Sequence, residues 1–416
     1  MRTEAGYDLC SFMGEVIMRV LFYYWNGLMA DDVISAMTKM GINIEPAVIP
    51  FKRGNYRDDA FVEKMMQLLE RKKYDAVFSV HYFHLISYCC HEKDIPYISW
   101  EYDSPVSIIN PEYFNYETNF CFMFDRNIMD RYRNSGMNRA FYMPLAVNTE
   151  RLERIPVGYA DIDKYGSDIS FVGQLYEDDF KKVLAGLPEY SRAYINGLCD
   201  AQMKIYGRDI ITDSVNDEIM DSVNGVIANL KDADLGFLND TGDRTMKKDV
   251  LVYFIEQLIT RNERLQLLDM LSADHKVKLY SGDKYDGLKN VQMCGYVDYA
   301  TEMPKVFRTS KINLNITLRS IESGIPLRCL DILGCRGFLL TNYQSEIAEY
   351  FKDGHDLAVY DSAEEACEKA DYYLKNNEER EKIAQNGFEK VKNDFSFEVQ
   401  LQKMLLKTGL GSGGNI

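Results

Sequence analysis

The sequence lacks any long hydrophobic run. Nowhere in its 416 residues does an uninterrupted apolar stretch approach the roughly 18 residues that a membrane-spanning helix needs. The first 17 residues include Glu4 and Asp8 and have no continuous apolar core, which is atypical of a signal peptide. These two absences predict a cytoplasmic protein with no membrane span.

Cysteine pairs with the spacing of zinc ligands are also missing. The nine cysteines are odd in number and include no Cys-x-x-Cys pair, so they describe neither a zinc site nor a disulfide framework. The neighbours Cys89 and Cys90 are more typical of small buried apolar residues than of metal ligands.

Positive charge is scarce. Lys and Arg number 48 against 64 Asp and Glu, which leaves a net charge of −16. Such a field repels phosphate backbones and anionic lipid, which argues against nucleic acid as a partner. A local basic pocket for a small anion is compatible with this balance.

The common phosphate-binding loops are absent as well. No G-x-x-x-x-G-K-[ST] segment occurs, and the one G-x-G-x-x-G match spans 409–414. No strand precedes that match and only two residues follow it, so it opens no helix. The sequence therefore excludes a P-loop NTPase and argues against a dinucleotide-dependent dehydrogenase.

What the sequence does contain is a repeated alternation of short apolar runs with helix-length periodic segments. This alternation is typical of βαβ units and a parallel sheet. Two such halves predict two Rossmann-like domains that face each other across a cleft, where the carboxyl edges of both sheets would hold ligands. The predicted strands are 18–25, 42–49, 74–80, 96–102, 121–124 and 140–146 in the first half, and 167–176, 277–282, 291–297, 311–317, 337–342 and 356–360 in the second.

The same pattern predicts the boundaries of the parts of the chain. Residues 1–17 fit no element and are expected to be an extension. The predicted order is an N-terminal domain over 18–150, a polar linker over 151–166, a C-terminal domain over 167–395 with a largely helical stretch at 178–271, a last helix within 396–408 and a flexible tail over 409–416.

The segment 314–342 carries the strongest chemical signal. A strand leads into a loop with Arg319, and Gly324-Ile325-Pro326 then opens a short helix that places Arg328 in its first turn. The positive end of the helix dipole disfavours a cation there, and a bound anion would reverse the sign. Free N–H groups together with Arg328 and Arg319 therefore predict a diphosphate site.

Asp331 lies three residues after Arg328, on the same face of that helix. Two interpretations stay open at this point. The carboxylate accepts hydrogen bonds from a ribose diol, or it forms an ion pair with Arg328 and binds no ligand.

Candidates for a general base follow two strands of the first half. Asp103 comes just after PYISWEY, and His81 directly follows YDAVFSV. A base must reach the proton that it removes, and both residues would lie at the carboxyl edge of the first sheet. The alternatives are that Asp103 caps the turn before Ser104 and that His81 is a hydrogen-bonded polar residue without a catalytic role. For Asp125, which follows CFMF at the same edge, a role as base and a cap on the next helix both stay open.

Two matches to the Asp-x-Asp pattern of metal-using transferases, at 161–163 and 232–234, follow no convincing strand. In so acidic a chain they are interpreted as surface charges.

The sequence resembles group 1 glycosyltransferases of the spore-maturation, CgeB-like type. The resemblance covers most of 18–400 and is most specific in 311–351. It is carried by SFVGQLY, VQMCGYVDY, the segment SKINLNITLRSIESGIPLRCLDILGCRGFLLTNYQSEIAEYF, the C-terminal YYLKNNEEREKIAQNGFEKV, and, in the first half, YDAVFSVHYF, IPYISWEYDSP and FYMPLAVN.

The resemblance implies a GT-B fold whose C-terminal domain holds a nucleotide-sugar donor, and a last helix that packs back on the N-terminal domain. It also implies a reaction without metal or other cofactor, since the helix dipole and arginines neutralise the diphosphate. The implied donor site consists of Gly173 and Gln174 near the phosphates, Tyr296 and Val297 at the base, Arg319, Gly324, Ile325, Pro326, Leu327 and Arg328 at the diphosphate, and Asp331 at the ribose. Many relatives have glutamate at the two positions that Ser323 and Asp331 occupy here. How the donor sugar is held, and the stereochemistry of the transfer, therefore stay open.

These expectations converge on an enzyme that moves a sugar from a nucleoside diphosphate sugar to an acceptor hydroxyl, with the acceptor unidentified. Two alternatives stay open. One is a nucleotide-sugar epimerase on the same fold, and the other is a two-lobed protein that binds sugar or nucleotide without catalysis.

Overall fold

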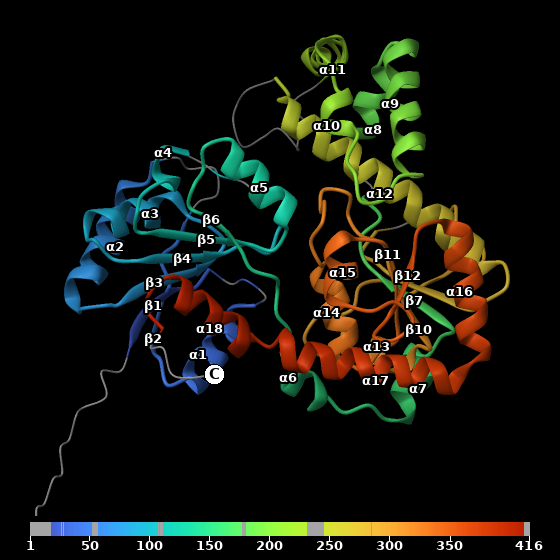
Figure 1. Ribbon diagram of the computed structural model, residues 1–416. Helices are drawn as coiled ribbons and strands as arrows, with labels where there is room; N and C mark the ends of the chain where they lie inside the picture. The colour runs from blue at the N-terminus through green and yellow to red at the C-terminus, as the bar shows by residue number, and fades with distance from the viewer. Residues whose placement is uncertain are drawn as a thin grey trace, which may run out of the picture.

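The computed structural model describes residues 18–25, 27, 29–51, 57–106, 108, 111–176, 180–230, 245–283 and 285–411. The expected N-terminal extension, 1–17, and the last five residues of the expected tail lie outside the described residues. Figure 1 shows two α/β domains side by side, with a group of helices above the second one.

The first domain is built on a six-stranded parallel sheet in the order β2-β1-β3-β4-β5-β6. All residues of β3 and β4 are buried, as expected for central strands that helices cover on both faces. The strands are β1 (Arg19–Tyr23), β2 (Asn43–Ala47), β3 (Ala76–Val80), β4 (Tyr97–Trp100), β5 (Asn119–Met123) and β6 (Ala140–Tyr142), and the helices are α1 (Ala30–Lys39), α2 (Asp59–Arg71), α3 (His84–Glu92), α4 (Pro111–Phe114) and α5 (Arg126–Asn134).

The second domain has another six-stranded parallel sheet, in the order β12-β11-β10-β7-β8-β9. The chain starts at β7 and adds strands first on one side and later on the other, so the strand order reverses between β7 and β10. Ligands in such sheets bind at the carboxyl ends of the strands near this reversal. The strands are β7 (Ile169–Val172), β8 (Val277–Tyr280), β9 (Gln292–Met293), β10 (Ile312–Asn315), β11 (Leu339–Asn342) and β12 (Ala358–Tyr360), and the helices are α13 (Met303–Thr309), α14 (Leu327–Gly334), α15 (Ser345–Tyr350), α16 (Ala363–Lys375) and α17 (Asn377–Asp394).

Between β7 and β8 the chain forms a helical lobe with a core of its own. Its helices are α8 (Phe180–Gly186), α9 (Glu189–Gln202), α10 (Ile211–Ser214), α11 (Asp217–Asn229) and α12 (Lys248–Ser272). The first half of α12 contributes Leu251 and Ile255 to the lobe's core. The second half contributes Leu267, Leu268 and Leu271 to the core under the second sheet. A single long helix therefore anchors the lobe to the domain.

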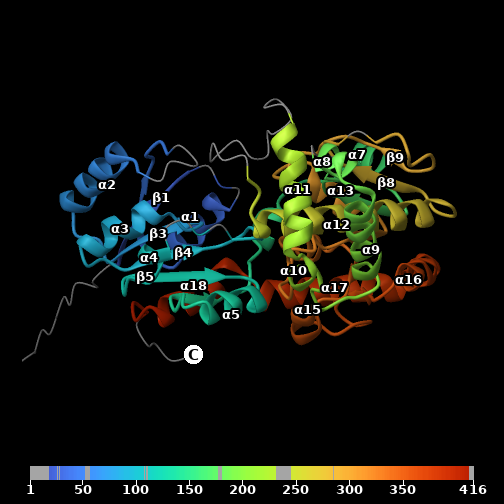
Figure 2. The same cartoon turned by 90° about the horizontal axis from the view of Figure 1, so that it is seen from above.

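The two domains are connected twice. Residues 151–166, expected to be a linker, contain the end of the short helix α6 (Thr149–Glu153) and all of α7 (Tyr159–Tyr165). The last helix, α18 (Phe397–Lys407), lies against the first domain (Figures 1 and 2). The ring of Phe397 is 5.9 Å from that of Trp100, and Leu401 shares a buried cluster with Phe22 of β1.

One carboxylate, that of Asp125, joins the domains at the end of β5. It caps α5, one of its two candidate roles, accepting from the Ile128 N–H at 3.1 Å. Its second oxygen accepts from three consecutive N–H groups of the loop after β10, those of Glu322, Ser323 and Gly324, at 2.7, 2.9 and 3.1 Å. The Ser323 hydroxyl also donates to Asp125, at 2.8 Å.

The glycine in this loop is required by the close approach of the two domains. A Cβ on Gly324 would lie 2.9 Å from the Phe124 carbonyl oxygen and 3.1 Å from the Cα of Asp125. A buried carboxyl group, Glu346 at the start of α15, supports the same contact: it accepts from the Arg126 N–H at 2.8 Å, and its oxygen lies 2.8 Å from the Ser323 hydroxyl oxygen.

Asp125→Ala is expected to destabilise the protein by about 2 kcal/mol or more, because it leaves several buried N–H groups without an acceptor. Urea unfolding measures this loss. Asp58→Ala is the matched control, since Asp58 caps only α2, through the Phe61 N–H at 2.9 Å, and the loss of a simple cap costs about 1 kcal/mol. Equal losses in the two variants would show that the contact between the domains contributes nothing.

Candidate active site

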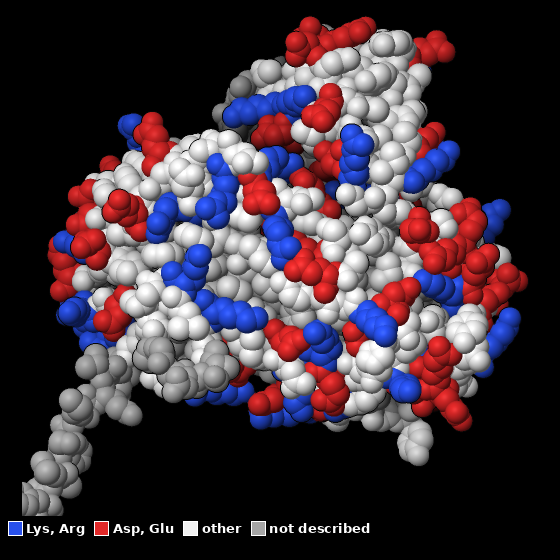
Figure 3. All heavy atoms as spheres, in the orientation of Figure 1, with Lys and Arg blue, Asp and Glu red and all other residues white. Residues whose placement is uncertain are grey.

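The carboxyl edges of the two sheets face each other. The contact between Asp125, after β5, and the loop after β10 brings these edges together. Figure 3 shows acidic and basic side chains intermixed on one face of the two domains. The predicted site residues follow strands that end at these edges, or lie on the helix that begins there.

Helix α14 begins at this junction. Pro326 occupies its N-cap position and has no side chain that could cap the first N–H groups. The guanidinium of Arg328, in the first turn, contacts the Met303 sulfur and lies 3.4 Å from the carboxylate of Asp331. The ion pair between Arg328 and Asp331, one of the two interpretations of their spacing, is therefore present.

Asp331 is no surface residue, however. It is 2% exposed and accepts a hydrogen bond from the Tyr299 hydroxyl at 2.9 Å. Burial raises the pKa of Asp331 to about 6, although the neighbouring Arg328 opposes the rise. A buried carboxylate with so few partners has capacity to accept further hydrogen bonds.

The first domain contributes a polar group to the same place. The hydroxyl of Tyr102, just after β4, is buried with no hydrogen-bond partner among the described residues. Burial raises the pKa of Tyr102, and the carboxylates of Asp32 and Asp331 add to the rise. Buried polar atoms almost always find a partner, and this hydroxyl is one of seven buried side-chain atoms without one among the described residues.

Arg151, of the short helix α6, completes this cluster. It donates two hydrogen bonds of 3.0 Å to Asp32, and its guanidinium lies 5.8 Å from the centre of the Tyr299 ring. We call the cluster the donor corner and define it as Tyr102, Arg151, Tyr299, Arg328 and Asp331. Sequence reasoning found only Arg328 and Asp331, because the other three come from three separate segments that no local spacing connects.

Arg319 does not join Arg328, contrary to expectation. Its guanidinium is paired with Glu263 of α12, with one hydrogen bond of 2.9 Å. It also donates to the Ile205 carbonyl at 2.9 Å and lies 4.4 Å from the centre of the Tyr206 ring. The physical reason is that a buried cation needs a neighbouring carboxylate, and the helical lobe supplies one.

The other residues predicted for the donor site lie just after β7 and just after β9. Gly173 lies against Phe171, since a Cβ there would come within 2.9 Å of that ring. The buried Arg264, which sequence reasoning missed, donates to the carbonyls of Gln174 and Ile316 and so joins the loops after β7 and β10. Of the two residues expected at the base, Tyr296 is 75% exposed and Val297 is 8% exposed.

The helix-opening residues divide between the interface and the core. Gly324 lies against the first domain, as described above, and Ile325 is 1% exposed. Leu327 is half-buried at the first position of α14. None of the residues from Gly324 to Leu327 has a charged side chain. Any phosphate bound by this segment is therefore held by its backbone N–H groups.

His81 and Asp103 lie together at the carboxyl edge of the first sheet, after β3 and β4. Nε2 of His81 is 3.5 Å from the carboxylate of Asp103, which is 71% exposed. Nδ1 of His81 is 3.1 Å from the buried carboxylate of Glu101, a partner that sequence reasoning missed. His81 also has a φ of 65°, a left-handed conformation that is uncommon for a residue other than glycine and that concentrates at functional sites.

The first Asp-x-Asp match is engaged in local structure. Asp161 accepts from the Gly158 N–H at 2.9 Å and from Lys305 at 3.0 Å. The second match, at 232–234, lies outside the described residues. Within the described part of the chain, no group of three or more His, Cys, Asp and Glu side chains is placed to hold a metal ion. Among the same residues, no helix is both long and apolar enough to cross a membrane.

Comparisons with known proteins agree with this architecture. Residues 255–406 match a family described as "Glycosyl transferase-like". A glycosyltransferase from Rickettsia africae has a TM-score of 0.54 at 11% identity, covering 94% of this chain and 98% of its own. Sucrose-phosphate synthase from Thermosynechococcus elongatus has a TM-score of 0.53 at 9% identity, with 94% and 99% covered.

Anabaena HepE in complex with UDP has a TM-score of 0.51 at 9% identity, with 94% of this chain and 100% of that chain covered. The chain therefore has the GT-B fold of two facing Rossmann-like domains, as predicted. No curated protein matches it by sequence.

Glu263→Gln is expected to lower the free energy of unfolding by about 3 kcal/mol or more, because it leaves Arg319 as an unpaired buried cation. Urea denaturation measures the loss. The control is Glu70→Gln, which removes a largely exposed pair with Lys93 and should cost at most about 1 kcal/mol. A loss as small as that of the control would contradict the structural role of Arg319.

Proposed function

We propose that this chain is a glycosyltransferase that moves a sugar from a nucleoside diphosphate sugar to an acceptor hydroxyl, of the CgeB-like type and without a metal ion. The observation that carries the proposal is the donor corner. It combines a helix N-terminus, an arginine, a buried carboxylate and a partnerless hydroxyl at the junction of two facing sheets. The GT-B fold and the match of residues 255–406 to a glycosyl transferase-like family support it.

In this proposal the diphosphate binds at the start of α14. Its charge is favoured by the helix dipole and by the first N–H groups, which Pro326 does not cap. Arg328 turns from Asp331 toward the diphosphate and adds charge-assisted hydrogen bonds. These groups stabilise the negative charge that develops on the leaving nucleoside diphosphate, which is the task that a metal ion performs in other transferases.

The ribose is assigned to Asp331. Its carboxylate is buried and accepts from the Tyr299 hydroxyl, and the Tyr102 hydroxyl of the first domain has no partner among the described residues. A ribose diol placed there would add a hydrogen bond to Asp331 and supply one to Tyr102. Tyr102 belongs to the first domain and Asp331 to the second, so donor binding would also hold the two domains in their closed arrangement.

The acceptor hydroxyl is assigned to His81. Glu101 accepts from Nδ1, which leaves Nε2 as the basic nitrogen of the ring. In the transfer step Nε2 takes the proton of the acceptor hydroxyl while the acceptor oxygen bonds to the anomeric carbon. The bond from that carbon to the phosphate oxygen breaks, and the nucleoside diphosphate leaves. Glu101 acts as a positioning residue, and the exposed Asp103 is the competing base.

The epimerase and the non-catalytic binding protein are the alternatives. An epimerase has no use for an acceptor base, whereas the Glu101–His81 pair at the opposite edge supports transfer. Release of nucleoside diphosphate only when an acceptor is present would separate a transferase from both alternatives.

The donor site is tested by the thermal shift of the protein with UDP, GDP, dTDP and CDP. A nucleotide at 100 times its Kd adds about 2.7 kcal/mol of stability, so we expect one nucleotide to raise the melting temperature clearly. Arg328→Ala should lose about 2 kcal/mol of that nucleotide's binding energy, measured by calorimetry. Arg154→Ala, which removes a mostly exposed arginine, is the control. Absence of any response in the wild-type protein would refute the donor site.

The base is tested by release of nucleoside diphosphate from the donor that responds. His81→Ala should lower turnover by about 10² to 10⁴ while nucleotide affinity stays unchanged. Glu101→Gln should lower turnover less and displace its pH profile, because Gln still accepts from Nδ1 but stabilises the charged ring less. Full activity of His81→Ala together with an inactive Asp103→Asn would transfer the role to Asp103.

A further inference from the structure

An exposed tryptophan lies beside His81 at the carboxyl edge of the first sheet. Trp25 follows β1 and is 40% exposed, whereas Trp100, the other tryptophan of the chain, is 0% exposed. The ring centres of Trp25 and His81 are 5.3 Å apart. Trp25 therefore borders the place to which the proposed function assigns the acceptor hydroxyl.

The indole ring of Trp25 is held in a fixed orientation although it is exposed. Its Nε1 donates to the Val80 carbonyl at 2.8 Å, which attaches the ring to the end of β3. Phe83 packs against the indole with ring centres 5.9 Å apart, and Phe83 itself packs against the buried Tyr23 at 5.0 Å. A ring that is already fixed loses little conformational freedom when a ligand stacks on it.

Gly27 lies against the same ring and leaves it uncovered. A Cβ on Gly27 would lie 3.6 Å from Nε1 and Cε2 of Trp25. Gly27 does not have a left-handed φ, so the backbone conformation does not require glycine there. A longer side chain would start in contact with the indole and take up part of the surface that the ring now exposes.

Polar groups beside the indole suit a ligand that carries hydroxyl groups. The carboxylate of Asp103 is 71% exposed and lies 3.5 Å from Nε2 of His81. A neutral pyranose has C–H groups on one face and hydroxyl groups around its rim, so it can stack on the indole and donate to the carboxylate at once. Together with Glu101, Asp103 disfavours an anionic ligand.

The helical lobe faces this edge from the second domain. Burial raises the pKa of Tyr253 of α12, and Tyr176 and the carboxylate of Asp103 add to the rise. Asp103 belongs to the first domain, so α12 runs close to the edge that carries it. A ligand stacked on Trp25 therefore lies on the side of the first domain that faces the second.

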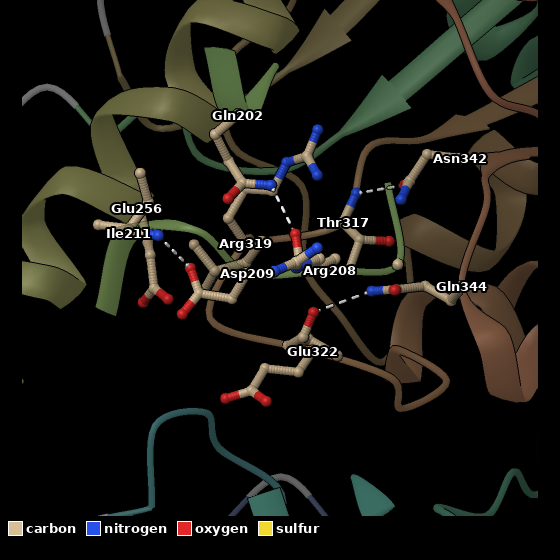
Figure 4. A pocket seen from close by; sticks show the side chains of 13 residues that line it. Gln202, Arg208, Asp209, Ile211, Glu256, Thr317, Arg319, Glu322, Asn342 and Gln344 are labelled. Carbon is tan, nitrogen blue, oxygen red and sulfur yellow. Dashed lines mark hydrogen bonds between the residues drawn. The ribbon is translucent and has the colours of Figure 1, made fainter. Parts of the chain in front are cut away.

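The enclosed pocket beside the lobe is too small for a sugar ring. It lies between the lobe and the loops after β10 and β11 (Figure 4), and its cavity volume is about 20 Å³. A cavity of this size has room for about one water molecule. The exposed ring of Trp25 has no such limit of space.

We propose that Trp25 is the surface on which a neutral pyranose ring of the acceptor stacks, with one hydroxyl of that ring directed to Nε2 of His81. The proposal rests on the proposed glycosyltransferase function and names the acceptor as a carbohydrate or a glycosylated molecule. Trp25 makes and breaks no bond. It binds the acceptor and orients it, so its loss should raise the KM for the acceptor more than it lowers kcat.

Tryptophan fluorescence tests the contact directly, because Trp100 is buried and only Trp25 is exposed to a ligand. The probes are the methyl glycosides of glucose, galactose, mannose and N-acetylglucosamine at millimolar concentration, with the full chain. At least one should change the emission saturably. Absence of binding by all four would overturn the proposal.

Variants followed by saturation-transfer NMR assign the binding to the ring. Trp25→Ala should weaken it about tenfold, the size of a lost stacking contact, whereas Trp25→Tyr keeps a ring and should lose less. Tyr159→Ala is the control, since it removes another exposed aromatic ring, which is 91% exposed on α7, and should change nothing. Unchanged binding in Trp25→Ala, or equal losses in Trp25→Ala and Trp25→Tyr, would overturn the stacking role.

Gly27→Leu separates binding from a structural role of Trp25. It keeps the indole and its hydrogen bond to Val80 but covers part of the ring, so it should weaken binding of the pyranoside without lowering the melting temperature. Unchanged binding in Gly27→Leu would show that the exposed ring is not the binding surface and would overturn the proposal.

Two competing ligands are distinguished in the same assay. Binding of 4-methylphenol that depends on Trp25, with no pyranoside bound, would assign the ring to an aromatic acceptor. Displacement of the pyranoside by a UDP-sugar would assign it to the donor sugar. Either result overturns the assignment to a carbohydrate acceptor.

The nucleotide response separates this proposal from the proposed function. Trp25→Ala should retain the thermal shift with nucleotide, because Trp25 is not part of the donor corner. A nucleotide response without pyranoside binding would overturn the role of Trp25 alone. Pyranoside binding that depends on Trp25, without any nucleotide response, would support the stacking surface and refute the transferase.

Discussion

The arrangement of this molecule depends on the carboxylate of Asp125. It caps the start of α5 and accepts hydrogen bonds from three consecutive N–H groups of the loop after β10. Those N–H groups form a concave array that favours an anion, and the anion comes from the opposite domain. Because the loop leads directly into α14, this one contact also determines where the helix N-terminus faces the first domain.

The arrangement of the second domain also depends on the helical lobe, which helix α12 joins to that domain. One face of this helix supplies Glu263, which neutralises the buried Arg319, and Arg264, which joins the loops after β7 and β10. The same helix carries Glu256, which lines a small pocket between the lobe and the loops after β10 and β11. The lobe therefore supports the carboxyl edge of the second sheet.

Several of the groups that we assign to function have a locally unfavourable feature. His81 adopts a left-handed backbone conformation, Arg328 is a cation in the first turn of a helix, and the Tyr102 hydroxyl is a buried polar group without a partner among the described residues. Each of these features is unfavourable in isolation, and each would be relieved by a ligand. They lie at the junction of the two sheets, whereas the central strands are filled with apolar side chains.

The sequence by itself determined the alternation of strands and helices, the two parallel sheets and the helix that opens near Arg328, because these follow from periodicity and from short-range steric and dipole effects. It also offered the helix cap as one of two roles for Asp125, since a cap lies within three residues of its partner. Only the tertiary structure decided that Asp125 joins the domains, that Arg319 pairs with Glu263 and that Glu101 contacts His81. These contacts connect residues from different strands, helices or domains, and the spacing of residues along the chain contains no record of which side chains the folded sheets bring together.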